Sequence, residues 1–432
     1  MLLYAPHITP RLQYMAAWLG EQLQIALQLT DDLLLYRGCR TEKINYSPTP
    51  IDEEEVHLFP TGLLHKQGIS YLDVILVKRH NRNVLFPTDD AMGFDFLSAV
   101  FYCISRYEEY MAYVPDLYGR YAHTNSLLFK GGCLQEPLVD LWLEDFRCLL
   151  RSKFPLLHVP EPVFRFIPTY DIDLAWRYQH KGWWRQLAGT LQQPHTLPQR
   201  IQVCMGKQPD PFDCYEWLNC LHQQYRFSPI YFFPMAERRS TLDKNISPAH
   251  TALQRLIQHQ QQQGAIIGLH PSVYSNTASE SLLQEKGRIE RITGTSVVHS
   301  RHHFLRMHLP HSYRQLLNVG IAHDFTMGYG TVNGFRAGTS RSFMWYDLER
   351  EAATQLRIHP FAFMDANAYY EAKQTPQQAL QELTVLCNRI SELRGTCITI
   401  FHNHLLGNDP LLAAWRNMYV QFLLQVHGIS KC

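Results

Sequence analysis

The stretch FRFIPTYDID, residues Phe164–Asp173, decides how this chain is expected to fold around its functional groups. Four of its first five residues are apolar or stiff, and two carboxylates, Asp171 and Asp173, follow with a single residue between them. Parallel strands of α/β domains are apolar along their length, and their functional groups lie where they end. Because residues i and i+2 of a strand share a face, both carboxylates can point into one cleft. The alternative interpretation is a turn whose two Asp residues cap the next helix.

Length and composition indicate the class of protein. The chain has 432 residues, enough for two domains or for one large barrel with an extension. Its formal net charge of +1 gives no electrostatic basis for binding nucleic acid or an anionic membrane. No window approaches ~18–20 uninterrupted apolar residues, so no transmembrane span is predicted. The ten cysteines include no CxxC pair and no signal peptide is evident, so we expect reduced thiols and a cytoplasmic location.

The pattern of apolar residues predicts two regions. Residues 1–160 combine short strand and helix patterns and are expected to form an N-terminal α/β extension domain, with Tyr71–Val77 as one of its strands. A segment rich in proline, Pro155–Pro162, leads into residues 161–432. About seven strand–helix alternations there predict a parallel (β/α) barrel, seven-stranded and distorted, rather than a sandwich. The strand segments expected in this region are Phe164–Asp173, Pro229–Pro234, Ala265–Ser272, Ser296–Phe304, Ile321–Met327, Leu356–Asp365 and Cys397–Leu406.

Ionisable residues follow or end most of these predicted strands. His270 ends the third, Arg301 and His303 end the fourth, and His402 ends the last. In a βα barrel these strand ends meet on one face. One histidine in such a place is usually structural, but the same placement on several strands indicates a shared site. Asp365, at the end of the sixth strand, fits a packing residue better than a functional one.

The order of these segments resembles the polysaccharide deacetylase family, also called the NodB homology domain or carbohydrate esterase family 4. TYDID looks like its first motif, GLHPSVYS like its second and ITIFHN like its last. SRHHF stands where that family carries its third motif. The resemblance covers Phe164 to about Leu406. Ahead of it, the DLYGRY loop (Asp116–Tyr121) and its neighbours look like an extension found before such domains in some bacterial surface-polysaccharide proteins.

This resemblance implies removal of an acetyl or similar acyl group from an amino sugar. In that family a divalent metal polarises the carbonyl and the attacking water, an Asp is the general base and a His the general acid. Carried over, Asp171 is the base, Arg301 orients it and His402 is the acid. Asp173 and His270 are the metal ligands. These ligand types suit Zn, and also Co, Ni or Fe.

One ligand of the family pattern has no counterpart in this chain. The family has a third ligand, a His four residues after the first, where this sequence has Tyr274. His303, from the next strand, could supply the missing imidazole. Three hypotheses follow: a metal-dependent deacetylase, a metal-free glycan-binding protein of the same fold, and a hydrolase of another small amide. No GxSxG motif is present, which argues against an α/β-hydrolase.

Three residues are predicted to contact the substrate, an amino-sugar-containing glycan or its precursor. Arg336, in the loop GFRAG, would clamp an anionic group, unless it is a surface Arg on a turn. Trp176 opens the run WRYQHKGWW, which would stack on sugar rings, unless the run is a half-buried insertion. Tyr274 is the third. The sequence gives no indication of the oligomeric state. The segment SRYEEY is expected to hold an internal ion-pair network that joins the two regions, formed by Arg106, Glu108 and Glu109.

Overall fold

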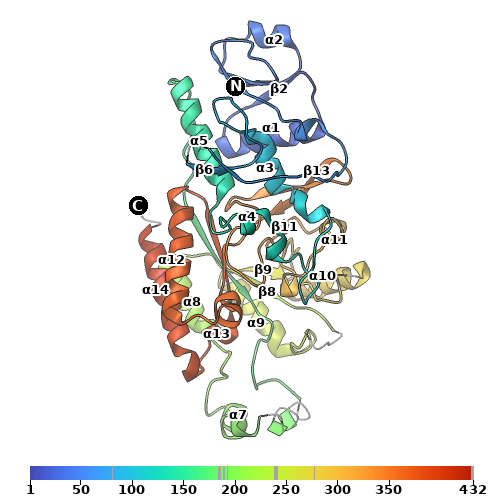
Figure 1. Ribbon diagram of the computed structural model, residues 1–432. Helices are drawn as coiled ribbons and strands as arrows, with labels where there is room; N and C mark the ends of the chain where they lie inside the picture. Colours follow the sequence, from blue (N-terminus) through green and yellow to red (C-terminus); the bar gives the residue numbers. More distant parts are fainter. Residues whose placement is uncertain are drawn as a thin grey trace.

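The computed structural model describes residues 1–79, 81–182, 186–187, 190–191, 193–237, 242–276 and 278–429. Within these residues the strands form a four-stranded sheet near the N-terminus, a nine-stranded sheet and a two-stranded sheet. Figure 1 shows the N-terminal elements at one end of the molecule and the larger sheet with its helices below them. The predicted α/β class is therefore confirmed.

The N-terminal sheet is entirely parallel, in the order β2-β1-β3-β4. Helix α1 begins at Pro10, which fits the first turn of a helix, and Thr9 caps it by accepting a hydrogen bond from the backbone N–H of Leu12. The bounds of these strands are Leu2–Tyr4 (β1), Gln28–Thr30 (β2), Lys43–Tyr46 (β3) and Glu55–Leu58 (β4). The helices are Pro10–Leu23 (α1), Leu33–Gly38 (α2), Phe96–Ile104 (α3), Leu127–Lys130 (α4) and Leu138–Lys153 (α5).

The strand predicted over Tyr71–Val77 is wrong. Residues 71–76 have no regular structure, and strand β5 (Val77–Arg79) begins where the prediction ends, paired with β6 (Arg82–Val84). Burial nevertheless alternates along this segment, because Leu72, Val74 and Leu76 pack against the core while the residues between them are exposed. Alternation predicts which side chains are buried, but a strand also needs a partner for its backbone.

The nine-stranded sheet follows the order β12-β13-β11-β10-β9-β8-β7-β15-β14. Neighbouring strands of this sheet are parallel except β12 and β13, which form an antiparallel pair. The strands are Arg165–Asp171 (β7), Ile230–Phe233 (β8), Ile266–Leu269 (β9), His299–Ser300 (β10), His323–Asp324 (β11), Phe343–Asp347 (β12), Ala352–Ile358 (β13), Phe363–Met364 (β14) and Thr396–His402 (β15).

The prediction of seven strands is wrong in its count. Strand β12 was not predicted, and the segment Leu356–Asp365, predicted as one strand, is divided between β13 and β14, so the sheet has two strands more than expected. Pro360 lies at this division and has no N–H to donate to a ladder. Here the chain leaves β13, near one edge of the sheet, and enters β14, at the opposite edge. The N–H of His359 donates to the carbonyl of Asp324 on β11 at 2.8 Å, and that of Ala362 donates to Ile398 on β15 at 3.1 Å.

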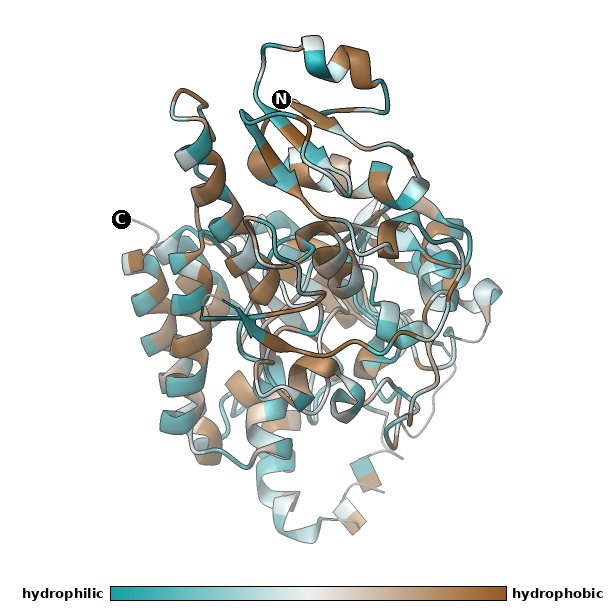
Figure 2. Ribbon diagram, turned by 45° about the horizontal axis from the view of Figure 1, so that its top comes forward, coloured by the Kyte–Doolittle hydropathy of each residue, from teal (hydrophilic) through white to brown (hydrophobic). Residues whose placement is uncertain are grey.

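Helices cover the outside of this sheet. Figure 1 shows α12 and α14 side by side along one flank, and the two helices contact each other extensively. In Figure 2 the helices of this flank, at the left, mix teal and brown along their length, as amphipathic helices do. The helices of this region are Leu197–Cys204 (α7), Tyr215–Tyr225 (α8), Thr251–Gln262 (α9), Ser279–Thr293 (α10), His311–Asn318 (α11), Pro376–Glu392 (α12), Asn403–Leu406 (α13) and Ala413–Ile429 (α14).

Buried ion pairs join the two regions, as the sequence predicts for the SRYEEY segment. Arg106 contacts Glu108 at 2.8 Å and Glu109 at 2.7 Å, and Glu109 also binds Arg336 of the second region at 2.6 Å. One hydrophobic cluster contains residues of both regions, including Leu19 from α1 and Phe343 from β12. The division of the chain near residue 160 stays a prediction.

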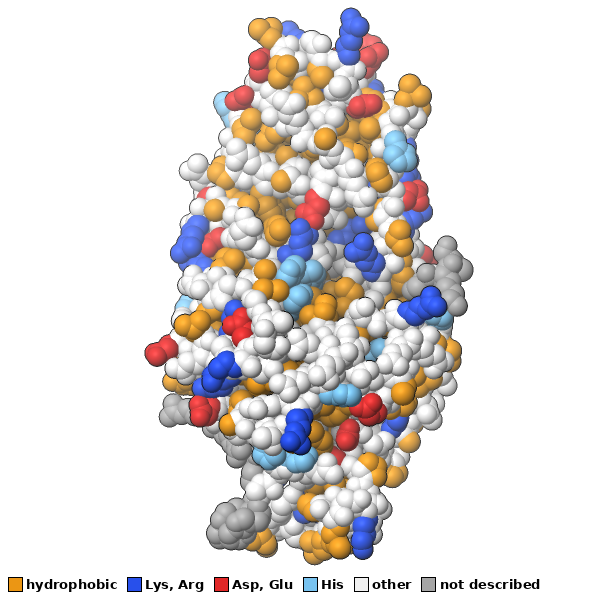
Figure 3. All heavy atoms as spheres, turned by 180° about the vertical axis from the view of Figure 1, so that it is seen from behind, with side chains coloured by type: hydrophobic (Ala, Val, Ile, Leu, Met, Phe, Trp, Pro, Cys, Tyr) orange, Lys and Arg blue, Asp and Glu red, His pale blue; other side chains and the backbone are white. Residues whose placement is uncertain are grey.

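Two surface properties bear on partners. Among the described residues, no helix combines the length and the apolar character that crossing a bilayer requires. On the face drawn in Figure 3, acidic and basic side chains are interspersed, and neither sign forms a broad continuous patch. This face therefore offers no extended electrostatic surface for a polyanion.

Candidate functional site

A pocket of about 430 Å³ lies at the carboxyl ends of several strands of the large sheet. Asp171, Asp173, His270, His303 and His402 all line it, although they are spread over more than half of the chain. The sequence predicts that Asp171, Asp173, His270, Arg301 and His402 share one pocket. Four of these line it, and Arg301 does not line it but contacts Asp171 at 2.8 Å.

The strands deliver these side chains through their lengths and register. Strand β7 ends at Asp171, which lies beside His402 at the end of β15. Strand β9 ends just before His270, and its Gly268 leaves room for the side chain of Phe232 on the neighbouring strand β8, since a Cβ there would lie 2.5 Å from the Phe232 ring. The end of each strand thus fixes where its functional group enters the pocket.

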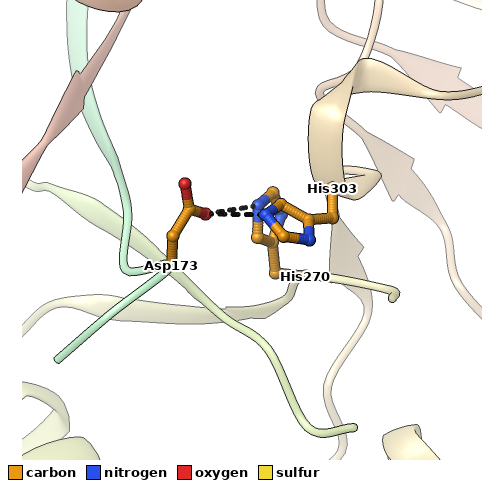
Figure 4. A group of neighbouring side chains, drawn as sticks. All are labelled: Asp173, His270 and His303. Atoms are coloured by element: carbon orange, nitrogen blue, oxygen red, sulfur yellow. Dashed lines mark ion pairs between the residues drawn. The ribbon is translucent and has the colours of Figure 1, made fainter. Parts of the chain in front are cut away.

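Asp173, His270 and His303 form the group drawn in Figure 4, in which one carboxylate oxygen faces both imidazoles. Asp173 Oδ1 lies 3.2 Å from His270 Nε2 and 3.3 Å from His303 Nε2. The potential ligand atoms all lie within 4.8 Å of one another. Asp173 Oδ1 is buried and has no hydrogen bond of good geometry, although both imidazoles are near. Three donor atoms that converge without satisfying one another fit a divalent transition metal.

Both imidazoles are held from behind through their other ring nitrogen. His270 Nδ1 bonds to the carbonyl oxygen of Arg301, and His303 Nδ1 lies 2.8 Å from Asp243 Oδ1. With the proton assigned to Nδ1, each ring presents the lone pair of Nε2 to Asp173. Metal-binding histidines are typically oriented in this way. No sequence pattern indicates Asp243, because it follows no strand directly and belongs to no recognisable motif.

The charges of Asp173 and His303 are buried, and each stabilises the ionised form of the other. Burial favours the neutral form of His303, but Asp173 and Asp243 raise its pKa to about 10. Burial also opposes ionisation of Asp173, yet His303 and His270 hold its pKa well below the ordinary value. In the metal-free protein the group is therefore a network of buried ion pairs, and a bound cation would replace the proton on His303.

Asp171 forms a second buried ion pair beside this group. Its Oδ1 lies 2.8 Å from Nη1 of Arg301, and both side chains are almost fully buried. Burial lowers the pKa of Arg301, and the charge of Asp171 opposes this. Arg301 is fixed further by donating to the carbonyl of Phe325 at 3.0 Å, with its guanidinium 4.5 Å from the ring centroid of Phe232. Arg301 therefore holds Asp171 in one orientation.

His402 faces the group across the pocket and is held by Asp365. Its Nδ1 lies 2.6 Å from Asp365 Oδ1, its backbone N–H donates to Oδ2 of the same carboxylate, and its Nε2 lies 3.8 Å from Asp173 Oδ2. Burial lowers the pKa of His402, but Asp365 and Asp173 raise it to about 9. Asp365 is thus the orienting partner of His402, a role more specific than the packing role expected from its position at a strand end.

The structure does not bring the three predicted substrate contacts into the pocket. Arg336 is 1% exposed, and its Nε and Nη2 both bind Glu109, so it is an internal ion-pair residue and not a clamp. Trp176 is 7% exposed and packs against His180 and Tyr215. Trp183 and Trp184 of the same run lie outside the described residues. Tyr274 is half exposed but lines a neighbouring pocket beside Glu285 and Arg288.

Comparisons with known proteins find one family model and a group of similar solved structures. A family of unknown function, DUF7033, matches residues 1–155. Among curated proteins, none matches the chain. Similar solved structures include polysaccharide deacetylases and a pseudoenzyme of carbohydrate esterase family 4.

A protein from Mycobacterium smegmatis assigned as a polysaccharide deacetylase is 13% identical, with a TM-score of 0.41 over 63% of this chain and 86% of that one. A polysaccharide deacetylase from Bacillus cereus is 9% identical, with a TM-score of 0.30 over 62% and 89%. A pseudoenzyme of carbohydrate esterase family 4 from Bacillus anthracis is 8% identical, with a TM-score of 0.31 over 62% and 63%.

Proposed function

We propose that this protein is a metal-dependent hydrolase that removes an acetyl or similar acyl group from the nitrogen of an amino sugar, in bacterial surface-polysaccharide metabolism. The observation that carries the proposal is the content of one pocket. A carboxylate paired with an Arg, a carboxylate–imidazole group and a histidine held by a carboxylate all line or border it. These are the parts that amide hydrolysis needs.

Asp173, His270 and His303 would hold the ion. When bound, a divalent metal supplies Lewis-acid polarisation of the amide carbonyl and of the attacking water. Carboxylate and imidazole ligands indicate a transition metal, with Zn favoured and Co, Ni or Fe compatible.

The chain's own groups account for the proton movements. Asp171, fixed by Arg301, takes a proton from the water as the new C–O bond forms. His402 gives a proton to the amide nitrogen as the C–N bond breaks, which leaves acetate and a free amine. Its raised pKa, about 9, keeps the imidazole protonated at neutral pH for this step, and Asp365 orients it.

One observation favours a second candidate, a metal-free glycan-binding protein. His303 is held between Asp173 and Asp243, so the buried charges are largely balanced without a cation. A protein that had lost its metal could keep the same fold and the same pocket.

Metal analysis separates the two candidates. The protein is purified, reconstituted with Zn, Co or Ni, and its metal content measured, with Asp173→Ala and His270→Ala as comparison variants. Stoichiometric metal that both substitutions abolish supports the hydrolase. No metal after reconstitution supports the binding protein. Acetate release from N-acetylhexosamine oligomers and from nucleotide-linked N-acetyl sugars then identifies the substrate. The cytoplasmic location predicted from the sequence would favour a precursor.

A further inference from the structure

The N-terminal region, which matches a family without a known function, reaches the pocket through one loop. Residues 115–121 form a turn whose ends pair as an isolated bridge between Pro115 and Tyr121. Of this turn, Tyr118 and Arg120 line the pocket together with Asp171, Asp173 and His303. The pocket is therefore built by both regions of the chain.

Asp116 makes this turn rigid. Its Oδ1 accepts the backbone N–H of Tyr118 and of Arg120, each at 2.9 Å, and its Oδ2 accepts the Nε–H of Arg120 at 2.6 Å. Gly119 adopts a φ of 74°, a left-handed conformation that glycine accepts without steric cost. The sequence DLYGR thus encodes a preformed turn, because an Asp at its start and a Gly within it satisfy the backbone locally.

Arg120 fixes the turn to the loop that carries His303. Its Nη1 donates to the carbonyl oxygen of Phe304, the residue after that histidine, at 2.8 Å. Phe304 has a φ of 57°, which costs energy in a residue other than glycine and has to be held by its surroundings. Gly330 leaves the space for this contact, since a Cβ there would lie 1.9 Å from Nη1 of Arg120.

Tyr118 is presented to the pocket by this arrangement. The ring of Tyr118 packs against the ring of Phe304 with centroids 5.3 Å apart, and the guanidinium of Arg120 lies 4.9 Å from the ring centroid of Tyr118. The side chain nevertheless stays 41% exposed, as does Tyr370 at 45%, which lines the pocket from the second region. An aromatic ring held in one orientation but left open at a polar pocket is a preorganised platform for an amphipathic ring.

We propose that Tyr118 is a substrate-binding residue on which a sugar ring of the substrate stacks, so that the N-terminal region supplies one wall of the site. This inference rests on the proposed function for its ligand class, amino sugars. It deepens that proposal by assigning the N-terminal region a part in recognition. Stacking needs the apolar face of Tyr118 and not its hydroxyl.

The test measures binding and turnover separately. Tyr118→Ala, Tyr118→Phe and wild type are titrated with N-acetylglucosamine, N,N′-diacetylchitobiose and UDP-N-acetylglucosamine, and acetate release is followed with the same compounds. Tyr71→Ala is the matched control, because Tyr71 is 83% exposed in the same region and does not line the pocket. The expected result for Tyr118→Ala is binding about fivefold to tenfold weaker, carried by KM and not by kcat, with metal content unchanged. Tyr118→Phe and Tyr71→Ala should stay within about twofold of wild type.

Equal binding by Tyr118→Ala and wild type overturns the inference, and so does a wild type that binds none of the three compounds. Binding that depends on Tyr118 without any acetate release upholds the stacking role while rejecting hydrolysis. Acetate release with an unchanged KM in Tyr118→Ala upholds hydrolysis and rejects the stacking role of Tyr118.

Discussion

At the scale of single residues, the pocket is a set of buried charges that depend on named partners. Asp171 has Arg301, His402 has Asp365, and His303 has Asp243 on one side and Asp173 on the other. Breaking a buried ion pair by removing one partner costs far more than the pair contributes as a whole, because the remaining charge stays buried. Substitutions at these positions should therefore change the free energy of unfolding or the metal affinity by amounts that can be measured.

The Arg301–Asp171 pair gives the first prediction. Arg301→Met should lower the free energy of unfolding by about 3–5 kcal/mol, because it leaves the carboxylate of Asp171 buried without its partner. Urea denaturation measures the effect. Adding Asp171→Asn to the same protein should recover part of the loss, since the uncompensated charge is then gone. A single substitution that costs less than ~1 kcal/mol would contradict the assigned pairing.

Asp243 gives the second prediction at this scale. Asp243→Asn should weaken metal binding by about 10–100-fold, because Asp243 orients the imidazole of His303. Calorimetric titration of the metal-free protein with Zn²⁺ measures the change, and Asp73→Asn, at an exposed position, is the control. Unchanged affinity in Asp243→Asn would contradict this role of Asp243 in orienting His303.

At the scale of elements, strand ends and preformed turns position the site. Strand length decides that Asp171, His270 and His402 enter one pocket, and the 115–121 turn adds Tyr118 and Arg120 from elsewhere in the chain. The strand expected over the apolar run Pro229–Pro234 is present as β8, because a run whose residues are all buried is typical of a parallel strand covered on both faces. The strand expected over Tyr71–Val77 is absent, because no neighbouring strand pairs with residues 71–76 in the described chain.

Two glycines provide a matched test of the turn. Gly330→Ala should displace Arg120, since the added Cβ would overlap Nη1, and it should weaken both thermal stability and binding of N,N′-diacetylchitobiose. Gly287→Ala is the control: it lies inside helix α10 with nothing within 4 Å of the added Cβ, so it should stabilise the protein by about 0.5–1 kcal/mol. Thermal unfolding of both variants decides the matter, and equal effects would mean that Arg120 adapts freely.

At the scale of the whole molecule, burial of neutral histidines makes the fold sensitive to acid. Burial lowers the pKa of His222 to about 3, of His299 to about 4 and of His359 to about 3. Each is neutral in the folded protein, whereas the unfolded chain binds a proton below about pH 6.5. Their contribution is therefore fully present above that pH and is lost as the pH falls from about 6.5 toward 4.

This gives a prediction for stability against pH. The free energy of unfolding, measured by urea denaturation, should fall by roughly 1.4 kcal/mol per pH unit for each of these histidines below about pH 6.5. His222→Gln should reduce the slope, since glutamine does not titrate and can still bond to the hydroxyl of Tyr170. His195→Gln, at an exposed position, should leave the slope unchanged. A stability that stays constant down to about pH 4 would contradict the assignment of these side chains as neutral.

By itself, the sequence determined the α/β class, the approximate strands of the second region and the convergence of Asp171, Asp173, His270, Arg301 and His402. These follow from apolar runs and from what comes directly after them, which are local properties of the chain. Only the tertiary structure decided the rest. Arg336 binds Glu109. Asp243 binds His303 and Asp365 binds His402. Tyr118 reaches the pocket from the N-terminal region. These pairings join segments far apart in the chain, and no local pattern encodes which distant charge or ring a side chain will meet.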